Sequence, residues 1–221
     1  YDHLQLSKFF GTVIFACVGL TLYVITRYSA HIRELRTRLQ TEERARRVAM
    51  HDQLTGLPNR RHLKGVLNWL LSSNHEGRRL GVVMLNIDRF KSFNDANGRV
   101  QGDEVLMNVG KILNLRAGVD GFVARLEADE FVILLPDQGE EELMDWLSAV
   151  LTAIEAPMRV GKAIVSISAT AGAAIGLTDG RDAETLLHRS SLALRRAKDT
   201  SRGWFAFFKT GMDELVRQRA L

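Results

Sequence analysis

The 221-residue sequence predicts an α/β fold of the α+β sandwich type. Short apolar runs alternate with amphipathic helical patterns from residue 52 onward. Hydrophobic residues make up 46% of the chain and charged residues 25%, as in ordinary globular proteins. A single cysteine excludes a disulfide scaffold and a cysteine-rich metal site. Because strands alternate with helices, we expect a sheet that helices cover on one face.

The first elements of the domain follow a turn. Residues 54–60 (LTGLPNR) bring Gly, Pro and Asn together, which predicts a turn and then a helix over Arg60–Leu71. The run Leu80–Ile87 is apolar almost throughout and predicts a buried strand. A helical pattern over Gln101–Leu115 follows.

The second half of the domain begins with a predicted hairpin. Two apolar segments, Phe122–Leu126 and Glu130–Leu135, are separated by a polar turn. The remaining elements that periodicity predicts are, in order, a helix over Glu141–Ala156, a strand over Ala163–Ala169, a helix over Ala183–Lys198 and a strand over Phe205–Phe208.

The stretch 9–26 predicts a transmembrane helix. Its 18 consecutive residues carry no charge and would span about 27 Å as a helix, close to the hydrocarbon thickness of a bilayer. A secretory signal peptide is the alternative, but arginines follow the stretch and no persuasive cleavage site is present. Basic residues beside a membrane segment stay inside the cell, so we expect the following domain to be cytoplasmic. Because the chain starts at Tyr1 without Met, residues 1–8 are expected to end a longer upstream region.

Residues 27–50 are expected to form one long helix. Tyr28, Ile32, Leu35 and Leu39 alternate at spacings of four, three and four, which is a heptad seam. Two interpretations stay open. The segment is either a solvated linker helix or a short parallel coiled coil that carries a signal from the membrane and pairs two copies.

The distribution of charge argues against nucleic acid as a partner. The net charge is +4, but residues 27–64 alone hold ten basic and four acidic side chains. Residues 27–64 therefore sum to +6, and residues 1–26 carry no net charge. The part of the chain after residue 64 accounts for the remaining −2. A nucleic-acid-binding domain would carry its positive charge on the fold itself.

Five segments of the domain carry a family resemblance. They are residues 51–61 (HDQLTGLPNRR), 86–95 (NIDRFKSFND), 102–106 (GDEVL), 124–131 (ARLEADEF) and 193–198 (ALRRAK). In this order and spacing, residues 51–208 resemble the GGDEF domain of diguanylate cyclases. The resemblance implies a nucleotide-cyclase-like fold with a central, mostly antiparallel sheet flanked by helices. Together with the predicted membrane span, the resemblance leads us to expect a bacterial inner-membrane protein whose domain lies on the cytoplasmic side.

The resemblance further implies a chemistry shared by two domains. In the family, two facing domains each hold one GTP, and each ribose 3′-hydroxyl attacks the partner's α-phosphate to give cyclic di-GMP. Divalent metal neutralises the developing charge of such a transfer. By resemblance, Asp129 and the backbone of Ile87 are metal ligands here. Mg²⁺ is therefore the expected cofactor if GTP is bound.

The sequence departs from the family where the chemistry is expected. The signature positions are Glu127, Ala128, Asp129 and Glu130, so both glycines are replaced, and Asn86 stands at the metal-binding aspartate. An amide oxygen is a poor substitute for a carboxylate on magnesium. The Cβ of Ala128 stands where glycine's backbone freedom is expected. Glu127 would bring a negative charge toward a triphosphate, and two like charges at about 5 Å repel by roughly 3 kcal/mol at an effective dielectric near 20.

The nucleotide-binding positions of the family are better matched. Asn94 and Asp103 stand where guanine is bound, and Lys91, Lys198 and Arg202 stand where phosphates are bound. Ordinary structural roles stay open for them. Asn94 would suit a turn and Asp103 a helix N-cap, while Lys198 and Arg202 would suit a solvated helix end.

The resulting expectation is a membrane-anchored, dimer-forming regulatory domain of cyclic di-GMP signalling. It would lack cyclase activity and bind GTP or another guanine nucleotide to control a downstream output. Residues 209–221 would begin a helix that leads to an EAL phosphodiesterase domain, or else a terminal helix that packs on its own domain. A weakly active cyclase and a nucleotide-free interaction scaffold are the alternative functions.

Overall fold

The computed structural model describes residues 19, 27–28, 48–73 and 79–210. The chain divides into two units, Tyr1–Ala49 and Met50–Leu221. Apart from Gly19, the predicted membrane span 9–26 lies outside the described residues, and most of the expected helix over 27–50 does too. Within the described ranges no helix has both the length and the apolar character needed to cross a bilayer. The predicted helix over 209–221 also falls almost wholly outside them.

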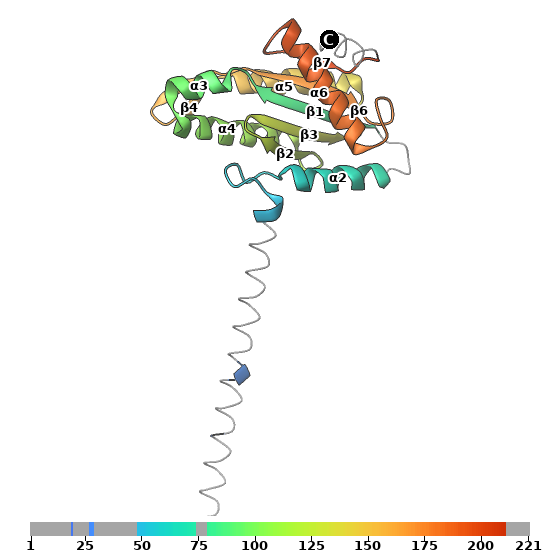
Figure 1. Cartoon of the computed structure of the whole chain (residues 1–221), viewed down its shortest axis with the longest axis horizontal. Coiled ribbons are helices and arrows are strands. Elements are labelled where there is room, and N and C mark those ends of the chain that lie inside the picture. Colours follow the sequence, from blue (N-terminus) through green and yellow to red (C-terminus); the bar gives the residue numbers. More distant parts are fainter. Residues whose placement is uncertain (1–18, 20–26, 29–47, 74–78, 211–221) are drawn as a thin grey trace, which may run out of the picture. The chain divides into compact units, whose positions relative to one another are not determined.

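The second unit alternates helices and strands, as the sequence predicts (Figure 1). Its helices are α2 (Arg60–Ser72), α3 (Phe90–Asn97), α4 (Arg99–Ala117), α5 (Glu140–Glu155) and α6 (Ala183–Thr200). Its strands are β1 (Leu80–Ile87), β2 (Phe122–Glu127), β3 (Glu130–Pro136), β4 (Met158–Val160), β5 (Ala163–Val165), β6 (Ala169–Ile175) and β7 (Phe205–Phe207).

Local signals place the ends of several helices. The side chain of Asn59 accepts hydrogen bonds from the N–H groups of Arg61 and His62 and so caps α2. Asp182 caps α6 in the same way through the N–H of Thr185. Gly98 has a φ of 89°, which ends α3 and lets α4 start at the next residue.

The main sheet has the strand order β2-β3-β1-β6-β7. All neighbouring strands are antiparallel except β6 and β7. The expected mostly antiparallel sheet is therefore confirmed. A separate hairpin of β4 and β5 stands outside this sheet.

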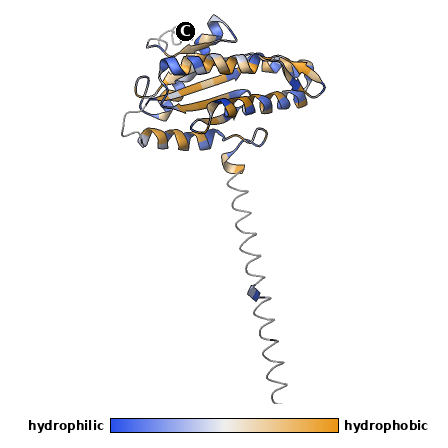
Figure 2. Cartoon of the chain, turned by 180° about the vertical axis from the view of Figure 1, so that it is seen from behind, coloured by the Kyte–Doolittle hydropathy of each residue, from blue (hydrophilic) through white to orange (hydrophobic). Residues whose placement is uncertain are grey.

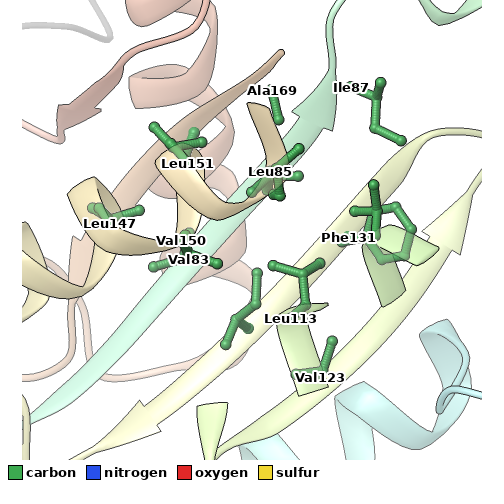
Figure 3. Close-up of a cluster of buried hydrophobic side chains, with 14 of the residues drawn as sticks. Val83, Leu85, Ile87, Leu113, Val123, Phe131, Leu147, Val150, Leu151 and Ala169 are labelled. Carbon is green, nitrogen blue, oxygen red and sulfur yellow. The ribbon is translucent and has the colours of Figure 1, made fainter. Parts of the chain in front are cut away.

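Helices cover both faces of the sheet, so the expectation of a single covered face is wrong. Side chains alternate along β1, which lies at the centre. Val83, Leu85 and Ile87 pack with α4 and α5 on one face (Figure 3). Val82 and Met84 belong to the core formed with α2 and α6 on the other. Because β1 is buried on both faces, it is apolar up to Leu85. The sheet strands are mainly orange in Figure 2.

The predicted strand over Ala163–Ala169 is wrong. Residues 163–165 pair with β4, and a new strand, β6, begins at Ala169. This strand has the sequence ATAGAAI, which is poor in the β-branched residues that usually mark strands. The small side chains have a packing reason, because a Cβ built on Gly172 would lie 2.0 Å from the backbone nitrogen of Leu194 in α6. The short elements α3 and β4 were also missed.

Candidate functional site

The carboxyl end of β1 buries two polar side chains. Asn86 and Asp88 are each 8% exposed. Asn86 pairs in register with Glu130 of β3 and with Thr170 of β6. The central position of β1 therefore places these polar groups beside the signature turn on one side and β6 on the other.

Asp88 is held by three hydrogen bonds. Its Oδ1 accepts from the Thr170 hydroxyl at 2.7 Å, and its Oδ2 accepts from the Ser168 hydroxyl at 2.8 Å and from the Gly203 N–H at 3.0 Å. These bonds join the end of β1 to β6 and to the turn that carries Arg202. Asp88 is thus a structural anchor of the site, a role that the sequence analysis did not identify.

The ammonium of Lys198 contacts the side chain of Asn86. Lys198 lies in the last turn of α6 and donates a hydrogen bond of 2.6 Å to Asn86 Oδ1. The two residues are 112 positions apart in the chain. They meet because Asn86 projects from the face of β1 on which α6 packs, and because Gly172 lets α6 lie directly on β6. Lys198, predicted to bind phosphate, therefore contacts Asn86, which stands at the predicted metal-binding position.

The residues at this position do not fit a divalent metal. The only side-chain oxygen that Asn86 offers is neutral and already accepts from an ammonium group. A divalent cation about 4 Å from that ammonium would be repelled by roughly 8 kcal/mol at an effective dielectric of about 20. Across the described ranges, no three His, Cys, Asp or Glu side chains gather closely enough to hold a metal ion.

The signature residues form the tight turn between β2 and β3. Ala128 has a φ of 44°, in the left-handed region where glycine is favoured. The N–H of Ile87 donates to the backbone oxygen of Asp129 at 3.3 Å, so the turn abuts the end of β1. The carboxylate of Glu127 lies 3.4 Å from the guanidinium of Arg60 in α2. Both of these side chains are more than half exposed, so their ion pair is weak.

Arg125 holds the signature turn against the segment that precedes α2. Its Nε and Nη2 donate to the backbone oxygen of Ala128 at 3.0 and 2.6 Å, and its Nη1 lies 2.8 Å from Asp52 Oδ1. Asp52 also accepts from the backbone N–H and the hydroxyl of Thr55. Burial alone would raise the pKa of Asp52, but the bonds from Thr55 and the charge of Arg125 outweigh it and lower that pKa. No local signal marks this contact, because Asp52 and Arg125 are 73 residues apart.

The predicted guanine-binding residues lie on α3 and α4. Asn94 packs on Gly102, because a Cβ built there would lie 1.8 Å from Asn94 Oδ1. That oxygen is buried and has no hydrogen-bond partner within the part of the chain that the structure describes. Asp103, the next residue after Gly102, is exposed. Since α4 begins at Arg99 with Gly98 as its cap, Asp103 is not a helix N-cap.

A cavity of about 410 Å³ lies beside Asp88. Its lining includes Arg89, Ser92, Ser168 and Arg202. Arg89 precedes α3 with a φ of 54° and a ψ of 28°, an uncommon backbone conformation for a residue other than glycine. The cavity brings the predicted phosphate ligand Arg202 close to the start of α3.

Some of the predicted site residues contact one another or lie near the site, and others do not. It brings Lys198 to Asn86 and places Asn94 beside Gly102, the neighbour of Asp103. Arg202 lies at the cavity beside Asp88. Lys91 is exposed in the first turn of α3.

Comparisons with known proteins identify the fold and the family. A family model described as diguanylate cyclase, GGDEF domain, matches residues 49–203. A signaling protein of Caulobacter vibrioides is 32% identical over 85% of this chain, and the cyclic di-GMP phosphodiesterase PdeR of Escherichia coli is 32% identical over 80%. This chain covers 24% and 27% of these two relatives, so it spans about a quarter of their length.

A solved structure agrees with the family model. The GGDEF domain of TpbB from Pseudomonas aeruginosa superposes with a TM-score of 0.73 at 31% identity. The match covers 76% of this chain and 99% of the TpbB domain. This chain belongs to the GGDEF family of cyclic di-GMP signalling.

Proposed function

We propose that this chain is a regulatory GGDEF domain that binds guanine nucleotide and does not synthesise cyclic di-GMP. One observation carries the proposal: the Lys198 ammonium donates to Asn86 Oδ1 at 2.6 Å. Transfer between two GTP molecules requires metal to neutralise charge on the reacting phosphates. An amide engaged by an ammonium group is unsuited to hold that metal.

The signature turn supports the loss of catalysis. Ala128 carries a Cβ at a left-handed backbone position, and Glu127 adds a carboxylate beside it. Glycine at both positions would leave room for phosphates to approach the backbone. Here the turn presents side chains instead.

Asn94 in α3 and Asp103 in α4 support the binding of a guanine base. A buried acceptor without a partner costs about 1–3 kcal/mol, and Asn94 Oδ1 is such an acceptor among the described residues. The N1–H and amino group of guanine are donors that would satisfy it once the Asn94 side chain turns away from Gly102. The exposed carboxylate of Asp103, which follows Gly102 in α4, is a second acceptor for the same edge of the base.

The proposal also includes a membrane anchor, pairing of two chains and a downstream output domain. The uncharged stretch 9–26 would anchor the chain in a bacterial inner membrane with the GGDEF domain on the cytoplasmic side. The heptad seam after it would pair two chains in parallel. PdeR is named a phosphodiesterase and is about four times as long as the matched region, which supports an EAL-type output domain beyond this chain.

Calorimetry with product analysis tests the proposal. The full chain, purified in detergent, is titrated with GTP, and the same samples are analysed for cyclic di-GMP by chromatography. We expect saturable binding without product. Asn94→Ala should weaken binding at least tenfold, while Asn97→Ala, which changes an exposed asparagine of the same helix, should leave it unchanged.

Two other results would each replace the proposal. Cyclic di-GMP whose yield rises with protein concentration would show a weakly active cyclase, because that reaction needs two domains. Absence of both binding and product would show an interaction scaffold that uses no nucleotide.

A further inference from the structure

We infer that Lys198 takes the place of a divalent metal, so that this domain binds the phosphates of a nucleotide without Mg²⁺. The inference rests on the proposed nucleotide-binding function and names the chemical form of the ligand. The expected ligand is the metal-free nucleotide anion rather than its magnesium complex.

One hydrogen bond holds the Lys198 ammonium, and the packing of α6 positions the helix that carries it. Asn86 is nearly buried in the central strand, so its Oδ1 is a rigid acceptor. The helix that carries Lys198 packs directly on β6 at Gly172. Lys198 is itself half-buried, so part of its stem is already ordered. A preorganised cation loses little conformational freedom when an anion binds.

The charge of Lys198 is not neutralised by this contact. Its partner is a neutral amide, and within residues 48–73 and 79–210 no carboxylate forms an ion pair with it. The carboxylate of Asp88, two residues after Asn86, accepts hydrogen bonds from the hydroxyls of Ser168 and Thr170 and from the Gly203 N–H. A half-buried cation without a counter-ion favours an anionic ligand.

The ammonium also keeps donors for that ligand. Lys has three N–H donors, and Asn86 uses one of them. Two remain for phosphate oxygens. Arg202 and Arg89 are exposed and line the cavity beside Asp88, which does not include Lys198. The Lys198 ammonium itself supplies positive charge that a metal ion would otherwise bring to the phosphates.

Titrations with and without metal test this inference. The full chain is titrated with GTP in about 5 mM Mg²⁺ and again in excess EDTA. We expect affinities that agree within about threefold. Lys198→Met should weaken binding at least tenfold in both buffers, whereas Lys111→Met, the same charge change at an exposed position of α4, should have no effect.

The variant Asn86→Asp should restore a dependence of GTP binding on Mg²⁺. A carboxylate at this position would neutralise Lys198 and offer a charged oxygen to magnesium. We therefore expect this variant to bind GTP at least tenfold more tightly in Mg²⁺ than in EDTA. Urea unfolding of each variant checks that it is folded at the temperature of the titration.

The outcomes separate this inference from the proposed function. Wild-type binding that needs Mg²⁺, or a Lys198→Met variant that binds normally, would overturn the inference and leave nucleotide binding intact. Absence of binding in both buffers would overturn both.

Discussion

Arg125 and Asp52 form an ion pair at 2.8 Å that joins the signature turn to the start of the domain. The same guanidinium holds the backbone oxygen of Ala128. Asp52 stands two residues after Met50, where the second unit begins. The turn and the segment that enters the domain are therefore parts of one hydrogen-bonded network.

Asp52→Asn should lower the free energy of unfolding by about 2 kcal/mol at pH 7, because charged hydrogen bonds of this kind are lost. The pKa of Asp52 is lowered from its usual value of 3.8. Its stabilising effect is therefore complete above about pH 4 and is lost as the pH falls through the lower folded pKa. Urea unfolding at several pH values should show the wild type and the variant converging below pH ~4. Asp145→Asn, on the exposed side of α5, is the control and should change the free energy of unfolding at pH 7 by less than about 0.5 kcal/mol.

Gly172→Ala should destabilise the domain by about 3 kcal/mol or more, because overpacking against a backbone cannot be relieved by rotating a side chain. The new Cβ would lie 2.0 Å from Leu194 N and 2.3 Å from Ser190 O. Gly65→Ala in α2 is the matched control. Its Cβ meets nothing within 4 Å, so it should stabilise the helix by about 0.5–1 kcal/mol. Equal effects of the two changes on thermal unfolding would contradict the close packing of α6 on β6.

Ala128→Gly should stabilise the domain, because a left-handed backbone costs an L-residue about 1–2 kcal/mol. Part of that gain is offset by the greater freedom of glycine in the unfolded chain, so we expect a net gain of about 0.5–1 kcal/mol. Ala149→Gly in α5, a change at an exposed helical position, should instead destabilise by about 1 kcal/mol. Denaturant unfolding measures both changes, and the same sign for both would be evidence against the left-handed turn.

Asp88→Ala should destabilise the domain by about 2–3 kcal/mol, because the hydroxyls of Ser168 and Thr170 lose their acceptor. The Gly203 N–H would keep only its bond to the Thr170 hydroxyl oxygen. Asp95→Ala, on the exposed surface of α3, should change stability by less than about 0.5 kcal/mol. Since Asp88 also anchors the turn before Gly203, we expect the Asp88 variant to weaken GTP binding. Unchanged stability would contradict the anchoring role of this carboxylate.

Most of the fold could be predicted from local patterns. The run Leu80–Ile87 contains one polar residue, Asn86, and is otherwise apolar, and the strand has those bounds. The helix after Asn59 follows from its cap. The strand β6 could not be found in this way, because its Ala and Gly residues are selected by the close approach of α6 rather than by strand propensity.

The site was only partly accessible from the sequence. Motif spacing identified Asn86, Asn94 and Lys198 as important positions. It could not show that Lys198 contacts Asn86, because that contact depends on how α6 packs on the sheet. The roles of Arg125 and Asp88 were missed for the same reason, since their partners are distant in the chain.

Loss of cyclase activity is tested by an assay of the wild-type chain over a wide range of protein concentrations. The chain is incubated with GTP and Mg²⁺, and cyclic di-GMP is quantified by chromatography against a known amount added to parallel samples. The triple variant Asn86→Asp, Glu127→Gly and Ala128→Gly is assayed beside it for comparison. We predict no cyclic di-GMP from the wild type at any protein concentration. Product that increases more than linearly with wild-type protein would instead show a working cyclase site shared by two domains.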